Sequence, residues 1–434
     1  MKIYDNPTKT ELVEILQRPN SATGQIVESV KDIIKLVKDK GDKALFELTL
    51  KFDKADIHNL RLSKSLIDDS NKLLSQELKN AIKIAALNII KFHKAQVPKE
   101  ISVETMNGVR CWQKAVPIEK VGLYIPGGTA PLISTVLMLA YPATLAGCKQ
   151  IILCTPPDKE GKVNPAILYA AKISGVKEIY SCGGAQAIAA MAYGTETISK
   201  VDKIFGPGNQ YVTLAKQLVS NEVVAIDMPA GPSEVMILAD ESSNPKFLAA
   251  DLLSQAEHGI DSQVILATNN KTIASQTLVE LKNQLKNLPR KEIAMKSLKS
   301  GATIIMDNIQ EMIDISNSYA PEHLIVSIKD YSSIASKITN AGSVFLGNYT
   351  PESLGDYASG TNHTLPTNGF ARSYSGLNMD AYYKKITFQE STKQGLKIIG
   401  PFVETIANAE ELQAHKNAVS IRLKALEDET FMTI

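Results

Sequence analysis

Four of the six histidines lie in short polar stretches, where an imidazole could bind a metal ion or move a proton. In the first stretch, LLSQAEHG, Gln255 and His258 are three residues apart on an expected helix that Gly259 would end, so both side chains share one face. They could hold one metal ion together. The alternative is that His258 caps the helix C-terminus, where the helix dipole attracts a cation, and this motif alone favours the cap.

The second stretch, APEH, places Glu322 directly before His323 at the start of the expected strand LIVSI. An adjacent carboxylate and imidazole suit general acid–base chemistry. A loop with two exposed polar side chains explains the same residues equally well, so the motif by itself leaves both interpretations open.

The other two stretches lie further along the chain. The polar loop GDYASGTNH contains Asp356 and His363, and the last expected helix carries His415, which alone is typical of an exposed helical residue. Together, four residues form a mixed nitrogen and oxygen set without a thiolate: Gln255, His258, Asp356 and His415. Such a set suits Zn²⁺ or Mn²⁺ that stays open to substrate, although glutamine is an uncommon zinc ligand.

Glycine-containing turns follow expected strands at three places, and each turn precedes an expected helix: Tyr124–Gly128, Gly183–Gln186 and Gly206–Asn209. Backbone N–H groups at a helix N-terminus bind anions, and glycine lets a phosphate approach closely, so a nucleotide could bind here. Tight strand–helix turns also need glycine without any ligand, and this interpretation is favoured for any single turn. The side chains of Tyr124, Gln186 and Asn209 shift the balance towards a ligand, since open α/β sheets bind ligands at strand ends.

Ten short apolar runs, from KVGLYIP near residue 120 to GSVFLG near residue 345, must position these residues. Most are too continuously apolar for one-sided sheets, and they alternate with helical windows. This order predicts an α/β fold with mostly parallel sheets, in two units because one sheet would be too large. The sequence predicts helices over the first hundred residues, a less regular stretch over residues 348–400, and a final helix over residues 410–426.

The composition is that of a globular chain of 434 residues, of which 44% are hydrophobic and 21% charged. Lys plus Arg (47) nearly balances Asp plus Glu (46), which argues against a nucleic-acid partner. The four cysteines form no C-x-x-C pair and fit a reducing, cytoplasmic setting. Prolines and Gly127-Gly128 interrupt the uncharged run 121–148, so we expect no membrane span.

Long motifs resemble those of the histidinol dehydrogenase family: DLLSQAEHGIDSQVIL, NSYAPEHLI, GDYASGTNHTLPT and ELQAHKNAVSIRL, with VGLYIPGG, GGAQAIAA, FGPGNQYV and DMPAGPSEV upstream. The resemblance runs from near residue 20 to the end of the chain. It implies a zinc- and NAD-dependent dehydrogenase that oxidises L-histidinol to L-histidinaldehyde and then to L-histidine, the last steps of histidine biosynthesis. It also implies two incomplete Rossmann-like domains and a homodimer in which the C-terminal tail completes the partner's active site.

By motif matching, the resemblance implies a role for each candidate residue. The implied zinc ligands, for one ion per subunit, are Gln255, His258, Asp356 and His415. The implied catalytic pair is Glu322 and His323. Besides the metal ligands, the implied substrate contacts are Ser233, His323, His363 and Glu410. The implied NAD contacts are Tyr124, Gln186 and Asn209. In such a homodimer, Glu410 and His415 would act in trans.

The resemblance also implies a division of the chain into domains. An N-terminal arm covers residues 1–20, and a large Rossmann-like domain with the metal and catalytic residues covers 21–123 and 235–380. The second Rossmann-like domain, on the NAD side, covers 124–234, and a C-terminal helical dimerisation tail covers 381–434.

Residue chemistry indicates how such a site would work. Zinc would hold the amino and imidazole nitrogens of the substrate, and His323 would take the hydroxyl proton as hydride leaves. Glu322 would activate the water for the second oxidation, and Glu410 could pair with a positive group of the substrate. A cysteine thiohemiacetal is a competing route for that second step. Two other classes stay open: a zinc hydrolase, which would produce no NADH, and a metal-stabilised scaffold, which would unfold on chelation.

Overall fold

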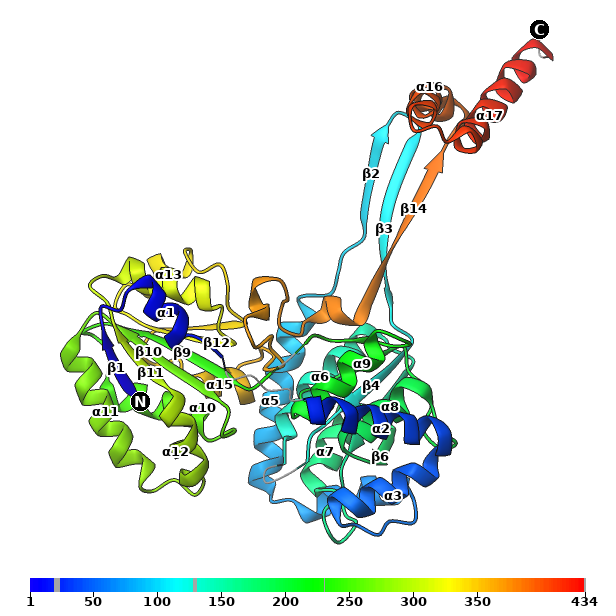
Figure 1. The fold of residues 1–434 in the computed structure, drawn as a ribbon. Helices are drawn as coiled ribbons and strands as arrows, with labels where there is room; N and C mark the ends of the chain where they lie inside the picture. The colour runs from blue at the N-terminus through cyan, green and yellow to red at the C-terminus, as the bar shows by residue number, and fades with distance from the viewer. Residues whose placement is uncertain (19–23, 128–130, 230, 433–434) are drawn as a thin grey trace. The chain divides into compact units, whose positions relative to one another are not determined.

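A computed structural model describes residues 1–18, 24–127, 131–229 and 231–432 of the chain. The chain divides into two compact units (Figure 1). The first unit comprises Met1–Gln96 and Ile118–Tyr382, and the second comprises Val97–Pro117 and Tyr383–Ile434.

The first unit contains a six-stranded parallel sheet in the order β1-β11-β10-β9-β12-β13. Its strands are β1 (Lys2–Asp5), β9 (Glu234–Ala239), β10 (Gln263–Thr268), β11 (Ala302–Ile305), β12 (His323–Ser327) and β13 (Ser343–Leu346). Every residue of β9, β10 and β12 is buried, because helices cover both faces of the sheet. The helices on one face are α10 (Pro245–Ala256), α11 (Lys271–Leu285) and α12 (Lys291–Ser300). Those on the other face are α1 (Lys9–Ile15), α13 (Ile309–Tyr319) and α14 (Tyr331–Ala335).

A second parallel sheet of the same unit has five strands in the order β6-β5-β4-β7-β8. Its strands are β4 (Lys120–Tyr124), β5 (Gln150–Thr155), β6 (Glu178–Ser181), β7 (Lys203–Phe205) and β8 (Ala225–Ile226). The helices that connect them are α6 (Ile133–Ala146), α7 (Pro165–Ile173), α8 (Gly184–Tyr193) and α9 (Gln210–Ser220). In chain order this sheet reads 3-2-1-4-5, the Rossmann order without its last strand, and the larger sheet repeats that order once β1 is set aside. The predicted fold class, with two incomplete Rossmann-like domains, is confirmed, and all ten apolar runs form strands.

The N-terminal helices are α2 (Gly24–Lys40), α3 (Asp42–Asp53), α4 (Lys64–Asp69), a 3-10 turn (Ser70–Leu73) and α5 (Gln76–Lys94). The apolar stripe of α2, with Val30 and Ile34, is buried in one core cluster with Tyr180 of β6 and Ile188 of α8. The implied domain division grouped these helices with the metal and catalytic residues, whereas α2 and α3 pack beside the five-stranded sheet. An amphipathic stripe predicts that a helix face is buried, but it does not identify the sheet that buries it.

The first eighteen residues extend the six-stranded sheet. β1 pairs in parallel with β11, with Lys2 opposite Ala302, and Leu12 and Ile15 of α1 pack against the core cluster on that face. The sequence predicted only helices here. A four-residue edge strand whose side chains are mostly exposed shows no apolar alternation, so β1 was missed.

The second unit is a three-stranded antiparallel sheet followed by two helices. The strands lie in the order β14-β3-β2, and the elements are β2 (Ile101–Met106), β3 (Val109–Pro117), β14 (Tyr383–Ser391), α16 (Lys393–Ala409) and α17 (Gln413–Met432). Few of its described residues are buried: Val109, Gly395, Gly400, Ala407 and Leu426. This unit therefore has almost no hydrophobic core of its own.

The prediction of a less regular stretch over 348–400 is wrong in part. This stretch contains α15 (Glu352–Tyr357), two 3-10 turns (Phe370–Arg372 and Met379–Tyr382), β14 and the start of α16. β14 is almost wholly exposed, and α16 includes Gly395, Gly400 and Pro401, so neither element shows the usual apolar period. Among the described residues, no helix combines the length and the apolar character that a membrane crossing requires.

Candidate active site

Glu322 and His323 lie at the amino-terminal edge of the six-stranded sheet, where Glu322 directly precedes β12 and His323 is its first residue. The chain reaches them through Ala320, whose backbone is left-handed with φ 55°, and Pro321. β12 pairs with β9, with His323 opposite Val235, and this register brings Glu234 beside the pair.

The opposite, carboxyl-terminal edge of this sheet is filled by the chain itself. Ser243 Oγ donates to the carbonyl of Ser327 at the end of β12, and the Asp240 carboxylate accepts from Lys329 N at 2.9 Å. Open α/β sheets usually bind ligands at that edge. Here the candidate catalytic groups lie at the other edge.

The backbone of Glu234 holds both candidate catalytic side chains. Its N–H donates to Glu322 Oε2 at 2.8 Å, and its carbonyl accepts from His323 Nδ1 at 3.1 Å. His323 Nδ1 and Glu322 Oε2 are 3.5 Å apart, and both side chains are buried. The interpretation of APEH as an exposed loop is therefore wrong.

Burial and charge change the acidity of both groups. Burial raises the pKa of the Glu322 carboxyl above its usual value, although the charge of His323 opposes the rise. Burial alone would lower the pKa of His323, but the carboxyl groups of Glu322 and Asp356 hold it well above its usual range. His323 Nε2 is buried, approaches Asp356 Oδ1 at 3.3 Å and has no hydrogen-bond partner among the described residues. This nitrogen is placed to exchange a proton with a bound group.

Asp356 lies on α15 and collects the predicted histidines around it. Burial raises the pKa of Asp356, but the close approach of His323 and the charges of His323, His363 and His258 outweigh burial and lower it. His363 Nδ1 donates to the backbone carbonyl of Asp356 at 3.0 Å, and its Nε2 lies 2.9 Å from Thr135 Oγ1. The Asp356 side chain is thus an ionised carboxylate among three imidazoles.

Gln255 is buried in the last turn of α10, one turn of chain before His258. In the amide orientation that satisfies both ends, its Nε2 donates to Glu352 Oε1 at 3.0 Å and its Oε1 accepts from Glu234 N at 3.1 Å. Glu352 and Asp356 are four residues apart on α15 and share one face. This face of α15 links Gln255 to the histidine cluster. His258 itself is exposed.

The remaining predicted residues have different surroundings. Ser233 is half-buried directly before Glu234, and its carbonyl accepts from Gln263 N at 3.0 Å. Glu410 directly follows α16 as its C-cap, and His415 lies on α17; both belong to the second unit and are exposed. Within the described ranges, no cluster of three or more His, Cys, Asp or Glu side chains is arranged to hold a metal ion. The predicted zinc set would not form such a cluster within one unit, because Gln255 is not one of these residue types and His415 belongs to the second unit.

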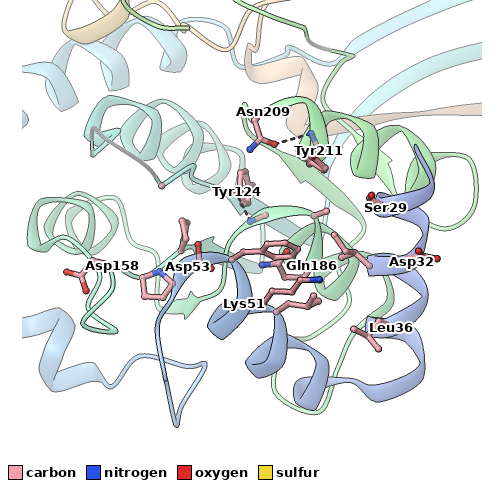
Figure 2. A pocket seen from close by; sticks show the side chains of 18 of the residues that line it. Ser29, Asp32, Leu36, Lys51, Asp53, Tyr124, Asp158, Gln186, Asn209 and Tyr211 are labelled. Atoms are coloured by element: carbon pink, nitrogen blue, oxygen red, sulfur yellow. Dashed lines mark hydrogen bonds between the residues drawn. The ribbon is translucent and has the colours of Figure 1, made fainter. Parts of the chain in front are cut away.

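A cavity of about 920 Å³ opens where the strands of the five-stranded sheet end (Figure 2). Tyr124 ends β4, Gln186 lies in the first turn of α8 after β6, and Asn209 precedes α9 after β7. All three predicted NAD contacts line this cavity. β4 and β7 are the neighbours at which the strand order reverses, the usual ligand position in a Rossmann-like sheet.

The contacts of these three side chains within the chain are specific. The Tyr124 hydroxyl is buried and accepts from Gly184 N at 3.0 Å, and burial raises its pKa. Gln186 is buried, and Asn209 Oδ1 caps α9 by accepting from the N–H groups of Tyr211 and Val212 at 3.0 and 3.1 Å. Asn209 therefore has a structural role whether or not it binds a ligand.

The glycines of two turns are required by close packing. Gly206 has φ +129°, and a Cβ there would lie 2.1 Å from the carbonyl oxygen of Tyr124; Gly184 has φ +66°. The buried Lys216–Asp227 ion pair fixes the turn at Gly206. Lys216 Nζ donates to Gly206 O, and Gly206 N donates to the Asp227 carboxylate, each at 2.8 Å. The structural interpretation of these glycines is correct, and the cavity adds a place for a ligand. Gly128 of the remaining turn lies outside the described residues.

The cysteines are poorly suited to covalent chemistry. All four are free thiols, and burial raises the pKa of Cys148 and of Cys154 to about 12 and raises that of Cys182 well above its usual value. Since the thiolate is the nucleophile, these three would react slowly at neutral pH. Cys111 lies on β3 of the second unit.

Sequence reasoning missed Glu234, Glu352, Thr135 and Arg18. Glu234 binds the catalytic pair, Glu352 binds Gln255, Thr135 contacts His363, and Arg18 forms an ion pair with Glu234 at 2.6 Å. A charged residue at the first position of an otherwise apolar strand was the available signal for Glu234. The other three show no comparable local pattern.

Comparisons with known proteins identify similar chains. A family model described as histidinol dehydrogenase matches residues 16–423. A histidinol dehydrogenase of Bacteroides thetaiotaomicron is 57% identical over 98% of this chain and 100% of its own length. One from Campylobacter jejuni strain RM1221 is 52% identical over 98% of this chain and 99% of its own.

Solved structures agree with these matches. The crystal structure of histidinol dehydrogenase from Elizabethkingia anophelis has a TM-score of 0.96 and 57% identity, covering 98% of this chain and 99% of that one. An acetylating aldehyde dehydrogenase from Geobacillus thermoglucosidasius shares the fold alone, with a TM-score of 0.51 and 14% identity over 85% of this chain and 97% of its own.

Proposed function

The chain belongs to the histidinol dehydrogenase family, and from this premise we propose that it oxidises L-histidinol to L-histidine through L-histidinaldehyde, with NAD⁺ as the hydride acceptor. These reactions are the last steps of histidine biosynthesis. The observation that carries the proposal is the buried Glu322–His323 pair, whose unpartnered Nε2 faces Asp356 at 3.3 Å. General acid–base catalysis needs such a group, held in one orientation and shielded from water.

The residues around Asp356 fit a zinc ion. Gln255, His258 and Asp356 would hold it, and His415 of the partner subunit would be the fourth ligand. The fit rests on oxygen and nitrogen donors without a thiolate, and on the lowered pKa of Asp356, which keeps that carboxylate ionised. Bound there, Zn²⁺ would act as a Lewis acid that orients the nitrogens of the substrate.

His323 serves the first oxidation as the proton acceptor. Its Nδ1–H is engaged by the carbonyl of Glu234, so Nε2 is the atom that takes the hydroxyl proton as hydride leaves the alcohol carbon. A cation bound to Asp356 would offset the negative charge of this carboxylate, which then no longer raises the pKa of His323. The imidazole of His323 can then be neutral. Ser233 and His363 contact the substrate beside this pair.

Glu322 serves the second oxidation, in which water must add to the aldehyde. Burial raises the pKa of this carboxyl, which makes its ionised form a stronger base than an exposed glutamate. The N–H of Glu234 orients Oε2 at 2.8 Å. The high pKa values of three of the cysteines favour this water route over a thiohemiacetal.

The cavity of the five-stranded sheet binds NAD⁺ through Tyr124, Gln186 and Asn209. Its volume of about 920 Å³ suits a ligand of this size, and its position at the strand-order reversal is the usual one for a dinucleotide. The five-stranded sheet is thus the NAD side of the enzyme, and the six-stranded sheet is the metal and catalytic side.

The enzyme works as a homodimer in which each C-terminal tail completes the active site of the other subunit. The second unit supports this, because it has almost no core and exposes large apolar side chains: Ile101, Phe402, Ile406 and Ile421 are 58–69% exposed. An apolar surface of this kind marks a protein interface. Glu410 and His415 then act in trans. We propose that the enzyme works in the cytoplasm, a reducing compartment in which its four free cysteine thiols stay reduced.

An NADH assay tests the proposal. The purified protein is incubated with L-histidinol and NAD⁺ as isolated, after chelation and after return of Zn²⁺, while circular dichroism follows the fold. The protein as isolated should form NADH. Chelation should stop NADH formation while the fold is retained, and return of Zn²⁺ should restore it. No NADH from L-histidinol under any of these conditions would overturn the proposal, and hydrolysis of a substrate without NADH would favour a zinc hydrolase.

A further inference from the structure

Two arginines cap the helix that leads into the catalytic pair. Arg18 Nη2 donates to the carbonyls of Tyr319 at 2.9 Å and Ala320 at 3.4 Å, and Arg372 Nη2 donates to the carbonyl of Ser318. These carbonyls end α13, three residues before Glu322. The C-terminus of a helix has unpaired carbonyls and a negative partial charge, so a guanidinium group there is stabilising.

The same guanidinium group also binds the strand on which the pair rests. Arg18 Nε and Nη2 meet the two carboxylate oxygens of Glu234 at 2.6 and 2.9 Å, in a bidentate arrangement. The side chain of Arg18 is 15% exposed and that of Glu234 only 3%. The guanidinium carbon also lies 3.9 Å from the centre of the Tyr319 ring. The planar guanidinium group of arginine can form the bidentate contact with Glu234 and stack on the Tyr319 ring at the same time, whereas the ammonium group of lysine cannot.

Arg18 therefore joins the two segments that position the catalytic side chains. One segment is the turn from Tyr319 to Glu322, and the other is Glu234, whose backbone N–H and carbonyl bind Glu322 and His323. A second tie runs beside the first: Tyr319 Oη donates to Gln263 Oε1 at 2.8 Å, and Gln263 Nε2 donates to the carbonyl of Gln17 at 3.2 Å.

From these contacts we infer that Arg18 is a positioning residue for the Glu322–His323 pair, so that the N-terminal segment belongs to the active-site machinery. The inference rests on the proposed function. Arg18 touches neither catalytic side chain and does not line the cavity assigned to NAD. It acts by fixing the distance between the α13 turn and β9. A displacement of about 1 Å in such a site can cost about 100-fold in rate.

The test compares Arg18→Ala and Arg18→Lys with a control, Lys9→Ala, which removes an exposed cation from the same segment. The kcat for L-histidinol should fall about 100-fold in Arg18→Ala and about tenfold in Arg18→Lys, while the KM for NAD⁺ stays within about twofold. Added guanidinium ion should restore part of the kcat of Arg18→Ala and leave Lys9→Ala unchanged. A merely structural role would not produce this rescue.

The outcomes separate this inference from the proposed function. No NADH from the wild-type enzyme would contradict the function itself. An active wild type with a folded Arg18→Ala variant of normal kcat would overturn the inference, as would full activity of Arg18→Lys. If Arg18→Ala does not fold, Arg18→Lys decides, because it retains the buried positive charge opposite Glu234.

Discussion

The carboxyl group of Glu352 accepts a hydrogen bond from the amide nitrogen of Gln255 at 3.0 Å, and both side chains are buried. Ser254 Oγ donates to the same carboxyl oxygen at 2.9 Å. Since the nitrogen end of the amide is engaged by Glu352, the oxygen end faces away from it. Only the oxygen end of a glutamine side chain is a good metal ligand. Glu352 thereby fixes the amide with its oxygen towards Glu234 N, at 3.1 Å, and this oxygen is the end of Gln255 that we propose to bind zinc.

Replacement of Glu352 should weaken zinc binding. Glu352→Leu removes the acceptor that orients Gln255, and the loss of such an outer-shell partner typically lowers metal affinity about 10- to 100-fold. Zinc affinity is measured by competition with a chromogenic chelator. The control is Glu292→Leu, an exposed carboxyl on α12. Equal zinc affinity in a folded Glu352→Leu variant and in wild type would contradict the assignment.

Replacement of Glu322 should separate the two oxidations. Glu322→Gln keeps an oxygen that can accept from Glu234 N, but it removes the base that activates water. We expect aldehyde oxidation to slow about 100-fold and alcohol oxidation less than about tenfold, because His323 takes the proton in the first step. NADH formation is measured from L-histidinol and from L-histidinaldehyde separately. A similar loss with both substrates would remove the distinction between the two roles.

Loss of the Tyr124 hydroxyl should weaken NAD⁺ binding. In Tyr124→Phe the N–H of Gly184, at the start of α8, loses its acceptor, which costs about 1–3 kcal/mol for a buried group. We expect the KM for NAD⁺ to rise about tenfold with little change in the KM for L-histidinol. Tyr141→Phe is the matched control, since the Tyr141 hydroxyl donates to the carbonyl of Ile173 outside the cavity. An unchanged KM for NAD⁺ would exclude this role for Tyr124.

Asp251 should make stability depend on pH. Burial raises the pKa of Asp251 from 3.8 to about 7, so the folded chain binds this proton more tightly than the unfolded chain. The contribution of Asp251 to stability therefore falls as pH rises from about 4 to about 7, and above that range the folded chain carries a charge on a half-buried carboxylate. Asp251→Asn should match the Tm of wild type near pH 4 and exceed it by a few degrees at pH 8.5, about 1–2 kcal/mol.

The measurement is thermal unfolding at several pH values, with Asp261→Asn, an exposed carboxylate, as control. A Tm difference between Asp251→Asn and wild type that stays constant from acid to alkaline pH would contradict the raised pKa. So would the same pH dependence in the control.

Local patterns predicted a large part of this molecule. The ten apolar runs form strands because a buried parallel strand is apolar along its whole length. Tyr124, Gln186 and Asn209 line one cavity because parallel strands end at one edge. β14 and α16 were missed, since the exposed side chains of β14 and the glycines and proline of α16 remove the usual period.

The sequence by itself determined the α/β class, the strand positions, the family and the chemical types of the candidate site residues, because each of these depends on neighbouring residues or on a contiguous motif. Only the tertiary structure decided that the catalytic pair lies at the amino edge of its sheet, that the backbone of Glu234 holds both members, and that Arg18 reaches Glu234 across 216 positions. Contacts between distant segments depend on strand register and on how turns direct backbone atoms, and neither leaves a local trace in the sequence.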